Sequence, residues 1–523
     1  MPVHVVHRST RRLHSLVAAF ALAAALVSGG SQALDQGAAA PEIARPDLKW
    51  FNVAAPVTME SLRGRIVVLD FWTEGCINCI HIIPTLRAIE EKYPDRVAVI
   101  GVHSPKFAEE KRAESVQDAI QRYEIRHPIV HDPKMQLWNA YDVQAWPTLV
   151  IIGADGKVLA NVSGEPDPQR FATAIGQLVA RAEEAGTPKA VALDLKPEET
   201  PQGRFLFPGK LKRVPGETVR WALADAGHHQ IVLLDDAGKD VRRYGSGKAG
   251  SADGDANTAT FKRPQGLIAS DDAIFVADTD NHAIRRIDLA SGQVTTLAGD
   301  GRRGTALPES PQAAKTTSLA SPWDLEKKGN RLFFANAGTH QIGALDLDAG
   351  RVSRYAGSGA EELTGGEPQR AAFAQPSGLA LSPDGRLLYV ADAESSAVRA
   401  IALDDGARTR TIVGAGLFDF GRKDGSLSAA RFQHPLGVAA ATKDTLIVAD
   451  TYNSRIRTID LARGEVSDFD GGKYTCTDPI CYPLREPAGV VVASADRVLL
   501  VDTGNHRIEE FQPSTKTSRT WAR

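Results

Sequence analysis

Four cysteines are the residues of this chain best suited to covalent chemistry, and they form two local pairs. Cys76 and Cys79 have two residues between them, and Cys476 and Cys481 lie five positions apart. In a Cys-x-x-Cys pair the second thiol can reach back one helical turn and resolve a mixed disulfide on the first. Two local pairs do not form the network of disulfides that stabilises a small domain without a large hydrophobic core. The first pair therefore predicts a redox centre.

The segment around the first pair predicts different roles for its two cysteines. Residues 66–71 are a β-branched apolar run typical of a buried strand, and residues 80–93 have helical spacing. The pair thus lies where a strand ends and a helix begins. Backbone N–H groups and the helix dipole favour a thiolate at that position, which lowers the pKa of the first cysteine. We expect Cys76 to be the nucleophile and Cys79 the resolving cysteine.

This segment resembles the active-site motif of the thioredoxin family. The family pattern of Asp-Phe-Trp, three residues and Cys-x-x-Cys is met from Asp70 to Cys79, and Pro84 matches the family's helix proline. The resemblance implies that Asp70 is a buried acid able to accept a proton from Cys79. The dipeptide Ile77-Asn78 replaces the usual Gly-Pro, so the family's redox potential and direction do not carry over.

A second part of the resemblance concerns substrate binding. Trp146-Pro147-Thr148 matches the segment that carries the family's cis-proline, just before a strand. The resemblance implies that Pro147 holds a backbone edge against which a substrate strand pairs. Trp72 and Trp146 are then expected to contact the substrate.

Three other interpretations of the motif remain open. A Cys-x-x-Cys pair can be half of a zinc site, although no second Cys/His pair lies nearby at ligand spacing. The domain could also be a vestigial thioredoxin fold that only binds. A peroxiredoxin would explain Thr73, three residues before Cys76, but that family's preceding proline is replaced by Leu69.

The C-terminal part of the chain contains a sixfold repeat. A small residue followed by Asp or Asn recurs at a spacing of 52–58 residues, and an aliphatic residue follows six positions later. The Asp/Asn positions are Asp225, Asp278, Asn336, Asp392, Asp450 and Asp502. A period of this length fits four short strands and a long loop, which is one propeller blade. The repeats resemble the NHL family, and six copies predict a six-bladed β-propeller.

The fold class is therefore multidomain, with an α/β thioredoxin-like domain followed by an all-β six-bladed NHL propeller. We expect a signal peptide (1–33), a tether (34–48), the thioredoxin-like domain (49–184), a linker (185–203) and the propeller (204–523). The N-terminus has arginines, a short apolar run and small residues at a cleavage site. It predicts a periplasmic or secreted protein, and an uncleaved anchor is the alternative.

Charge and composition exclude some partners. The formal net charge is −3, so no basic field would attract nucleic acid or a membrane surface. We expect no organic cofactor and no metal. Four propeller histidines share one turn position, where a hydrogen-bonding role is expected (His229, His282, His340 and His506). Cys476 and Cys481 are expected to form a structural disulfide, with a disulfide relay to Cys76 as the alternative.

These features predict an exported thiol-disulfide oxidoreductase whose propeller docks a partner protein. The expected partners are a thiol or disulfide client protein and a protein bound on the propeller face that carries the repeat turns and the long loops. The pairing of a Cys-Ile-Asn-Cys motif with an NHL propeller resembles a known two-domain family. This resemblance predicts the architecture of the chain better than it predicts the function. A non-catalytic scaffold in which both domains bind partners is the alternative.

Overall fold

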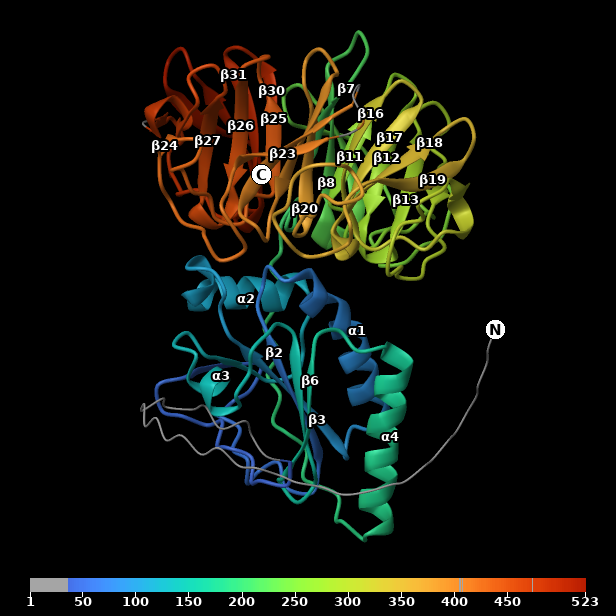
Figure 1. Ribbon diagram of the computed structural model, residues 1–523, viewed down its shortest axis with the longest axis vertical. Helices are drawn as coiled ribbons and strands as arrows, with labels where there is room; N and C mark the ends of the chain where they lie inside the picture. Colours follow the sequence, from blue (N-terminus) through green and yellow to red (C-terminus); the bar gives the residue numbers. More distant parts are fainter. Residues whose placement is uncertain (1–35, 404–405, 407, 473) are drawn as a thin grey trace, which may run out of the picture.

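The computed structural model describes residues 36–403, 406, 408–472 and 474–523 and folds them into two contacting domains (Figure 1). An α/β domain at the N-terminal side lies against one end of a β-propeller. The expected signal peptide lies outside the described residues. Within the described ranges, none of the helices has the length and apolarity needed to cross a membrane.

The first domain is built on a six-stranded sheet with the order β1-β4-β3-β2-β5-β6. The strands are β1 (Lys49–Phe51), β2 (Ile66–Trp72), β3 (Val97–His103), β4 (Ile129–His131), β5 (Thr148–Ile152) and β6 (Val158–Ser163). Strands β2, β3 and β4 are parallel, and β1, β5 and β6 run antiparallel to their neighbours. The unbroken apolar runs of β2 and β3 are explained by burial on both faces of the sheet.

Helices cover both faces of this sheet. Helices α1 (Ile77–Lys92) and α4 (Pro168–Glu184) pack on one face, and α3 (Gln136–Ala140) packs on the other. Helix α2 (Ala113–Arg122) follows the short 3₁₀ turn η1 (Glu109–Lys111) and packs against the first turn of α1. Figure 1 shows that α2 and the start of α1 are the helical parts nearest the propeller.

The expected tether and linker both pack on the first domain. Ile43 is fully buried in the core beneath the sheet, and the Gly37 N–H donates to the Val158 carbonyl oxygen at 2.8 Å. After α4 the chain runs back along the domain, where Arg65 donates to the Val191 carbonyl oxygen at 2.7 Å. Residues 37–48 thus belong to the folded domain rather than to a free tether, because Ile43 supplies apolar surface that the core can bury.

The propeller has six blades, each made of strands consecutive in sequence. Blades one and two contain β7 (Leu211–Val214), β8 (Arg220–Asp225), β9 (Gln230–Asp235), β10 (Asp240–Tyr244), β11 (Gly266–Ala269), β12 (Ala273–Asp278), β13 (Ala283–Asp288) and β14 (Val294–Ala298). Blades three and four contain β15 (Gln312–Ala313), β16 (Pro322–Lys328), β17 (Arg331–Asn336), β18 (Gln341–Asp346), β19 (Arg351–Ala356), β20 (Pro376–Leu381), β21 (Leu387–Asp392), β22 (Ala397–Ala402) and β23 (Thr409–Val413). Blades five and six contain β24 (Gly425–Ser426), β25 (Gly437–Ala440), β26 (Thr445–Asp450), β27 (Arg455–Asp460), β28 (Glu465–Asp468), β29 (Thr475–Cys476), β30 (Pro487–Ser494), β31 (Arg497–Asp502), β32 (Arg507–Gln512) and β33 (Thr517–Ala522).

The repeated Asp/Asn ends the second long strand of each blade and is buried. In blade two, Asp278 accepts a hydrogen bond from the Lys262 N–H at 2.8 Å and pairs with Arg285 at 2.8 Å. Burial raises the pKa of Asp278 to about 6, although Arg285 opposes this shift. The residue thus ties the incoming loop to the blade, which explains why it recurs at every repeat.

The side chain at the shared turn position joins each blade to the next by a hydrogen bond. His282 adopts a left-handed backbone, and its Nδ1 accepts a hydrogen bond from the N–H of Ser321 in blade three at 3.1 Å. Ser321 directly precedes the proline that opens its blade and is also left-handed. The same contact joins His229 to Arg263, His340 to Gln375, Ser396 to His434, Ser454 to Glu486 and His506 to Phe207.

The last of these contacts closes the ring, because it joins blade six to blade one. Lys210 of blade one also donates to the carbonyl oxygen of Ala488 in blade six at 2.6 Å and to that of Leu436 in blade five. Trp221 of β8 and Trp521 of β33 also pack edge to face between blades one and six, with ring centroids 6.1 Å apart. The ring therefore closes by side-chain packing and hydrogen bonds between complete blades.

Candidate functional site

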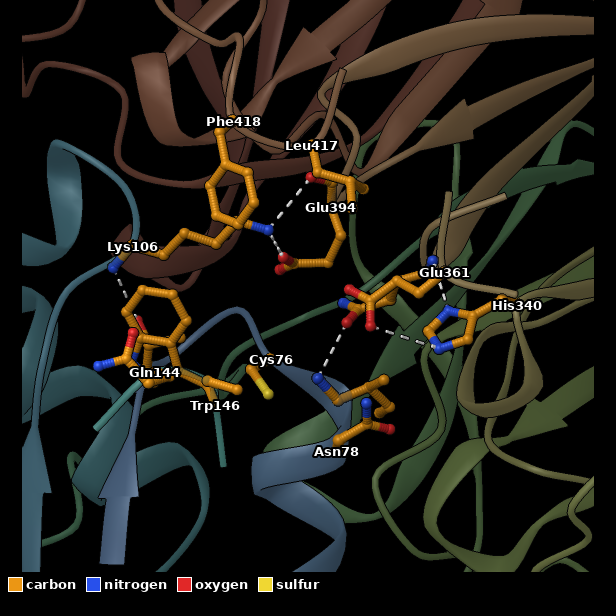
Figure 2. Close-up of a pocket in the computed structure, with 14 residues that line it drawn as sticks. Cys76, Asn78, Lys106, Gln144, Trp146, His340, Glu361, Glu394, Leu417 and Phe418 are labelled. Atoms are coloured by element: carbon orange, nitrogen blue, oxygen red, sulfur yellow. Dashed lines mark hydrogen bonds and ion pairs between the residues drawn. The ribbon is translucent and has the colours of Figure 1, made fainter. Parts of the chain in front are cut away.

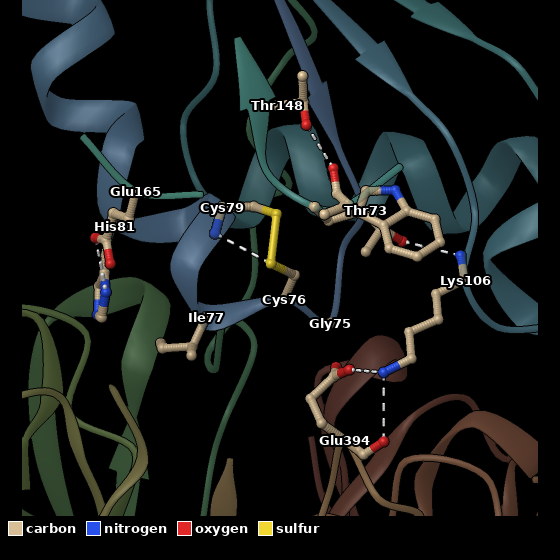
Figure 3. Close-up of a disulfide and its surroundings, with 12 residues drawn as sticks. Thr73, Gly75, Cys76, Ile77, Cys79, His81, Lys106, Thr148, Glu165 and Glu394 are labelled. Carbon is tan, nitrogen blue, oxygen red and sulfur yellow. Dashed lines mark hydrogen bonds and ion pairs between the residues drawn. A yellow bond between two sulfur atoms is a disulfide. The ribbon is translucent and has the colours of Figure 1, made fainter. Parts of the chain in front are cut away.

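The redox pair lies at the first turn of α1, at the end of the α/β domain that contacts the propeller. Cys76 is the residue that caps α1, and its Sγ accepts a hydrogen bond from the Cys79 N–H at 3.2 Å. The two cysteines form a disulfide (Figure 3). Cys79 is 1% exposed and Cys76 is 8% exposed, so the outer sulfur is the one that a reactant can reach.

Asp70 is buried on β2, the strand that leads into the redox motif. Burial raises the pKa of its carboxyl group to about 7, although the charge of His127 opposes this shift. Its Oδ1 has no hydrogen-bond partner among the described residues. A carboxyl group in this state can exchange a proton near neutral pH.

A second buried acid fixes the backbone just before Cys76. Glu110 accepts hydrogen bonds from the Gly75 N–H at 3.0 Å and from the Phe107 N–H at 2.8 Å. Burial raises the pKa of Glu110, while these backbone hydrogen bonds oppose the shift. Glu110 could not be identified from the sequence, because a single acidic residue in a short 3₁₀ turn gives no signal by itself.

The segment around Pro147 borders the redox pair. The Trp146–Pro147 peptide bond is cis. Trp146 packs on Trp138 with the two rings tilted and their centroids 4.3 Å apart, and its Nε1 donates to the Ser104 carbonyl oxygen at 2.8 Å. Trp72 differs from the expectation for a substrate contact. It is buried with its ring edge-on to His103, 4.9 Å between centroids, because it belongs to the core-forming strand β2.

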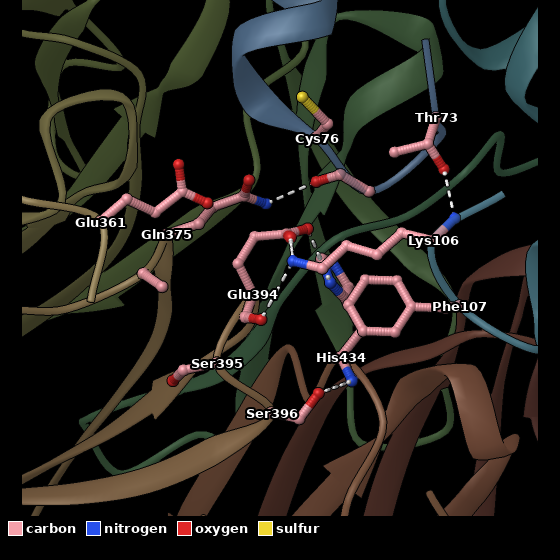
Figure 4. Close-up of polar contacts among 12 residues, drawn as sticks. Thr73, Cys76, Lys106, Phe107, Glu361, Gln375, Glu394, Ser395, Ser396 and His434 are labelled. Carbon is pink, nitrogen blue, oxygen red and sulfur yellow. Dashed lines mark hydrogen bonds and ion pairs between the residues drawn. The ribbon is translucent and has the colours of Figure 1, made fainter. Parts of the chain in front are cut away.

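The propeller covers the face of the α/β domain that carries the redox pair. The contacts are made largely by the residues that precede the blade-opening prolines. Gln375 contributes the central contact, since its side-chain oxygen accepts from the Ile77 N–H and its side-chain nitrogen donates to the Gly75 carbonyl oxygen, both at 2.9 Å (Figure 4). The propeller face expected to dock a partner protein therefore carries the chain's own α/β domain.

Buried ion pairs cross the same interface. Arg122 of α2 pairs with Glu74, 3.2 Å away, and with Glu486 of blade six. Burial raises the pKa of Glu74 well above its usual range, and the charge of Glu486 adds to this effect while Arg122 opposes it. Arg122 is thus the cation shared by two buried acidic side chains from different domains.

A second ion pair lies beside Cys76. Lys106 pairs with Glu394 of blade four, and both side chains are buried. Burial alone would raise the pKa of Glu394, but Lys106 and His434 lower it to about 2. Glu394 therefore carries a full negative charge, and Figures 3 and 4 show this pair between the two domains near Cys76.

On the other side of α1, His81 contacts the propeller. Its Nε2 lies 2.8 Å from the Ser321 hydroxyl oxygen, and its Nδ1 lies 3.1 Å from Glu165. Glu165 also pairs with Arg303 of the propeller. Apolar contact completes the interface, because Trp323 of blade three packs into the cluster that contains Cys76.

A pocket of about 190 Å³ remains between the two domains, and Cys76 lines it (Figure 2). The α/β domain contributes Cys76, Lys106 and the segment before Pro147, and the propeller contributes the opposite wall. The propeller residues are His340, Glu361, Gln375, Glu394, Leu417 and Phe418. The sulfur of Cys76 thus faces a small space lined by charged residues.

The second cysteine pair lies away from this pocket. Cys476 and Cys481 form a disulfide in the loop that carries β29. Strand β29 pairs with β33 at the outer edge of blade six. The disulfide therefore closes a loop at the rim of the propeller, and Cys76 lies at the contact between the domains.

Comparison with known proteins agrees with both halves of this architecture. Residues 64–158 match the model of a thioredoxin-like family, and residues 432–459 and 484–511 match the NHL repeat. Over 135 residues the chain is 26% identical to "Thiol-disulfide oxidoreductase ResA" of Bacillus cereus, covering 26% of this chain and 73% of that protein. The protein is thus a thioredoxin-like domain joined to an NHL-repeat propeller.

Two longer matches identify the family. The chain is 37% identical to "NHL repeat-containing protein 2" of Bos taurus over 512 residues, covering 90% of this chain and 70% of that protein. It is 35% identical to "Protein SUPPRESSOR OF QUENCHING 1, chloroplastic" of Arabidopsis thaliana, covering 88% of this chain and 45% of that protein. The chain belongs to the NHL repeat-containing protein 2 family.

Proposed function

We propose that the protein is a thiol-disulfide oxidoreductase that uses Cys76 and Cys79. The observation that carries this proposal is the disulfide at the start of α1 whose outer sulfur lines a pocket. The position at a helix N-terminus favours the thiolate that exchange requires. Similarity to a protein named as a thiol-disulfide oxidoreductase supports the same reaction class.

The reaction follows from the exposure of the two sulfurs. A substrate thiolate attacks Cys76 Sγ, the Cys76–Cys79 bond breaks, and Cys79 leaves as a thiolate. A second substrate thiolate then attacks the substrate sulfur of the mixed disulfide, which forms a substrate disulfide and releases Cys76 as a thiolate. Two thiols are oxidised and one disulfide is reduced, and the reverse sequence oxidises the pair.

Asp70 is proposed to exchange the proton that Cys79 gains or loses. Its pKa of about 7 allows both protonation states near neutral pH. Pro147 and Trp146 are proposed to bind the substrate, since the segment before Pro147 lies beside Cys76 at the pocket.

A redox titration tests the function. The mature protein is equilibrated with glutathione buffers, and the Cys76 and Cys79 thiols are counted by mass-shift trapping. We expect a reversible two-electron transition, with a potential below that of glutathione for a reductant and above it for an oxidant or isomerase. A pair that never titrates would overturn the proposal.

The alternative is a scaffold in which both domains bind partners, favoured by the extensive cover over the redox pair. Cys79→Ser separates the two proposals, because a nucleophile without its resolving cysteine retains its mixed disulfide. A trapped Cys76 adduct that is absent in Cys76→Ser supports the enzyme. Full activity in cells for both variants supports the scaffold.

We also propose that the protein works outside the cytoplasm. The basic and then apolar N-terminal sequence supports export, and so does a disulfide at an exposed loop of blade six. Fractionation of cells with an epitope at the C-terminus tests this, and a full-length chain in the cytoplasm would contradict it.

A further inference from the structure

The substrate of the redox pair must pass a steric barrier. Gln375 of the propeller lies against the backbone on both sides of Cys76, and Glu394 lies against Lys106. A folded client would need these same surfaces to reach the sulfur and to pair with the backbone near Pro147. In the docked arrangement of the two domains, the pocket is the space left for a reactant.

The size of the pocket limits what can enter. Its volume of about 190 Å³ is below the range of about 300–1,000 Å³ that is typical of sites for drug-sized ligands. Phe418 is 72% exposed and stands at its wall, opposite Trp146. A thiol compound with few heavy atoms fits this space, whereas a loop of a folded protein does not.

The charges around the pocket select among such compounds. Lys106 and Glu394 neutralise each other across the interface. Glu361 also lines the pocket, with a side chain that is 39% exposed and lies 3.8 Å from His340 Nε2. Burial and the charge of Glu394 raise the pKa of Glu361, while Lys106 opposes this shift. Burial lowers the pKa of His340 to about 4, so this histidine is neutral at pH 7 and does not balance Glu361. Of the two acidic residues that line the pocket with Cys76, Glu394 is thus paired with a cation and Glu361 is left to bind one.

We propose that the docked protein exchanges disulfides with a low-molecular-weight thiol that carries an ammonium group, held by Glu361 in the pocket between the domains. This inference rests on the proposed oxidoreductase function and adds its substrate class. The thiolate of the small compound attacks Cys76 Sγ and displaces Cys79 as a thiolate. A second molecule of the compound then releases Cys76, so two small thiols become one small disulfide while the protein disulfide becomes two thiols.

The test compares two small thiols of opposite charge. The oxidised full-length protein is mixed with cysteamine or with mercaptoacetate, and loss of the Cys76–Cys79 disulfide is followed by quenched thiol trapping. The ratio of the two rates is measured in the unmodified protein, in Glu361→Gln and in Glu362→Gln. Glu362 is a matched control, because it is the next residue along the chain and does not line the pocket.

We expect Glu361→Gln to lower the cysteamine-to-mercaptoacetate ratio by about 25-fold, because one charge a few ångströms away in water-like surroundings changes each rate by about fivefold and in opposite directions. Glu362→Gln should leave the ratio unchanged. Equal ratios in all three proteins would overturn the inference, while the redox pair could still titrate. If neither thiol reduces the pair, the oxidoreductase function itself fails.

A protein substrate provides the second measurement. Insulin is offered as a disulfide client to the reduced protein. We expect the protein to reduce insulin at least about tenfold more slowly than cystamine, when both rates are divided by the concentration of the Cys76 thiolate. Insulin cannot reach Cys76 while the propeller is docked. Insulin reduction at the rate of cystamine would overturn the steric argument.

Discussion

The side-chain oxygen of Gln375 accepts a hydrogen bond from the N–H of Ile77, the residue directly after Cys76, at 2.9 Å. That N–H is one of the free donors at the start of α1 that would otherwise stabilise a Cys76 thiolate. We therefore expect the propeller to influence the acidity of Cys76 as well as access to it.

Removing this hydrogen bond should make Cys76 more acidic. In Gln375→Leu the Ile77 N–H is free to donate toward the thiolate, so we expect the pKa of Cys76 to fall by about one unit. The reduction potential should rise accordingly. The measurement is thiolate absorbance of the reduced protein against pH.

Gln433→Leu is the matched control for this change. Gln433 also makes an amide hydrogen bond across the interface, to the Ala108 N–H at 3.0 Å, but it does not contact the motif. If both variants shift the pKa of Cys76 equally, looser docking rather than the specific hydrogen bond is responsible.

Arg122 should be the ion-pair residue on which docking depends most. Arg122→Met leaves Glu74 and Glu486 buried without their cation, at a cost of about 3–5 kcal/mol. We expect lower stability toward guanidinium and faster labelling of reduced Cys76 by a bulky maleimide. Lys189→Met, which removes an exposed pair with Asp95, should cost less than about 1 kcal/mol. Equal losses in the two variants would contradict a special role of Arg122 in docking.

The turn histidines should make the propeller sensitive to acid. Burial lowers the pKa of His506 to about 4, and its neutral Nδ1 accepts the Phe207 N–H. The unfolded chain binds a proton at this histidine below pH 6.5, while the folded chain does not until pH 4. Stability from this group is thus present above pH 6.5 and is lost as the pH falls toward 4.

Ser396 and Ser454 hold this position in two blades, so His506→Ser keeps an acceptor that does not titrate. Relative to the unmodified protein, we expect the variant to gain about 2 kcal/mol between pH 6.5 and pH 5. Urea unfolding at both pH values measures this difference. A constant difference in stability between the two proteins would contradict it.

Asp70 should have the opposite dependence on pH. Burial raises its folded pKa to about 7, so the folded protein keeps a proton that the unfolded chain releases above pH 3.8. This group therefore destabilises the protein progressively as the pH rises from about 4 to 7. We expect Asp70→Asn to stabilise the protein by on the order of 2–4 kcal/mol at pH 8 and to have little effect at pH 3.5.

The same variant should exchange disulfides more slowly, because Cys79 loses its proposed proton acceptor. Urea unfolding and the rate of cystamine reduction test the two effects in one protein. A variant that is stabilised at pH 8 but keeps the full exchange rate would leave Asp70 with a structural cost and no role in the reaction.

The two domains could be predicted from the sequence because their signals are local or repeated. The Cys76 motif lies within one strand and helix. The repeated Asp or Asn residue holds the incoming loop to its blade in each copy, as Asp278 shows. The burial of Ile43 was missed, since a single apolar residue in an Ala/Pro-rich segment does not form a pattern.

The covered redox site could not be predicted for a different reason. The residue before each blade-opening proline differs from copy to copy, as Ser321, Gln375 and Glu486 show, because each contacts another part of an asymmetric domain. A repeat is recognised from the residues that its copies share, so positions that differ between copies give no signal. The interface is therefore encoded where the repeat is least regular.

This irregularity means that the blades are not interchangeable. The propeller has approximate sixfold symmetry, yet the α/β domain docked at one end of it has none. Exchanging the order of two blades would preserve the hydrogen bonds at the shared turn positions between neighbouring blades. It would move Gln375 away from Cys76 and Glu486 away from Arg122. A circularly permuted chain that keeps the blade order should still dock, whereas a shuffled one should yield a closed ring with an uncovered redox pair.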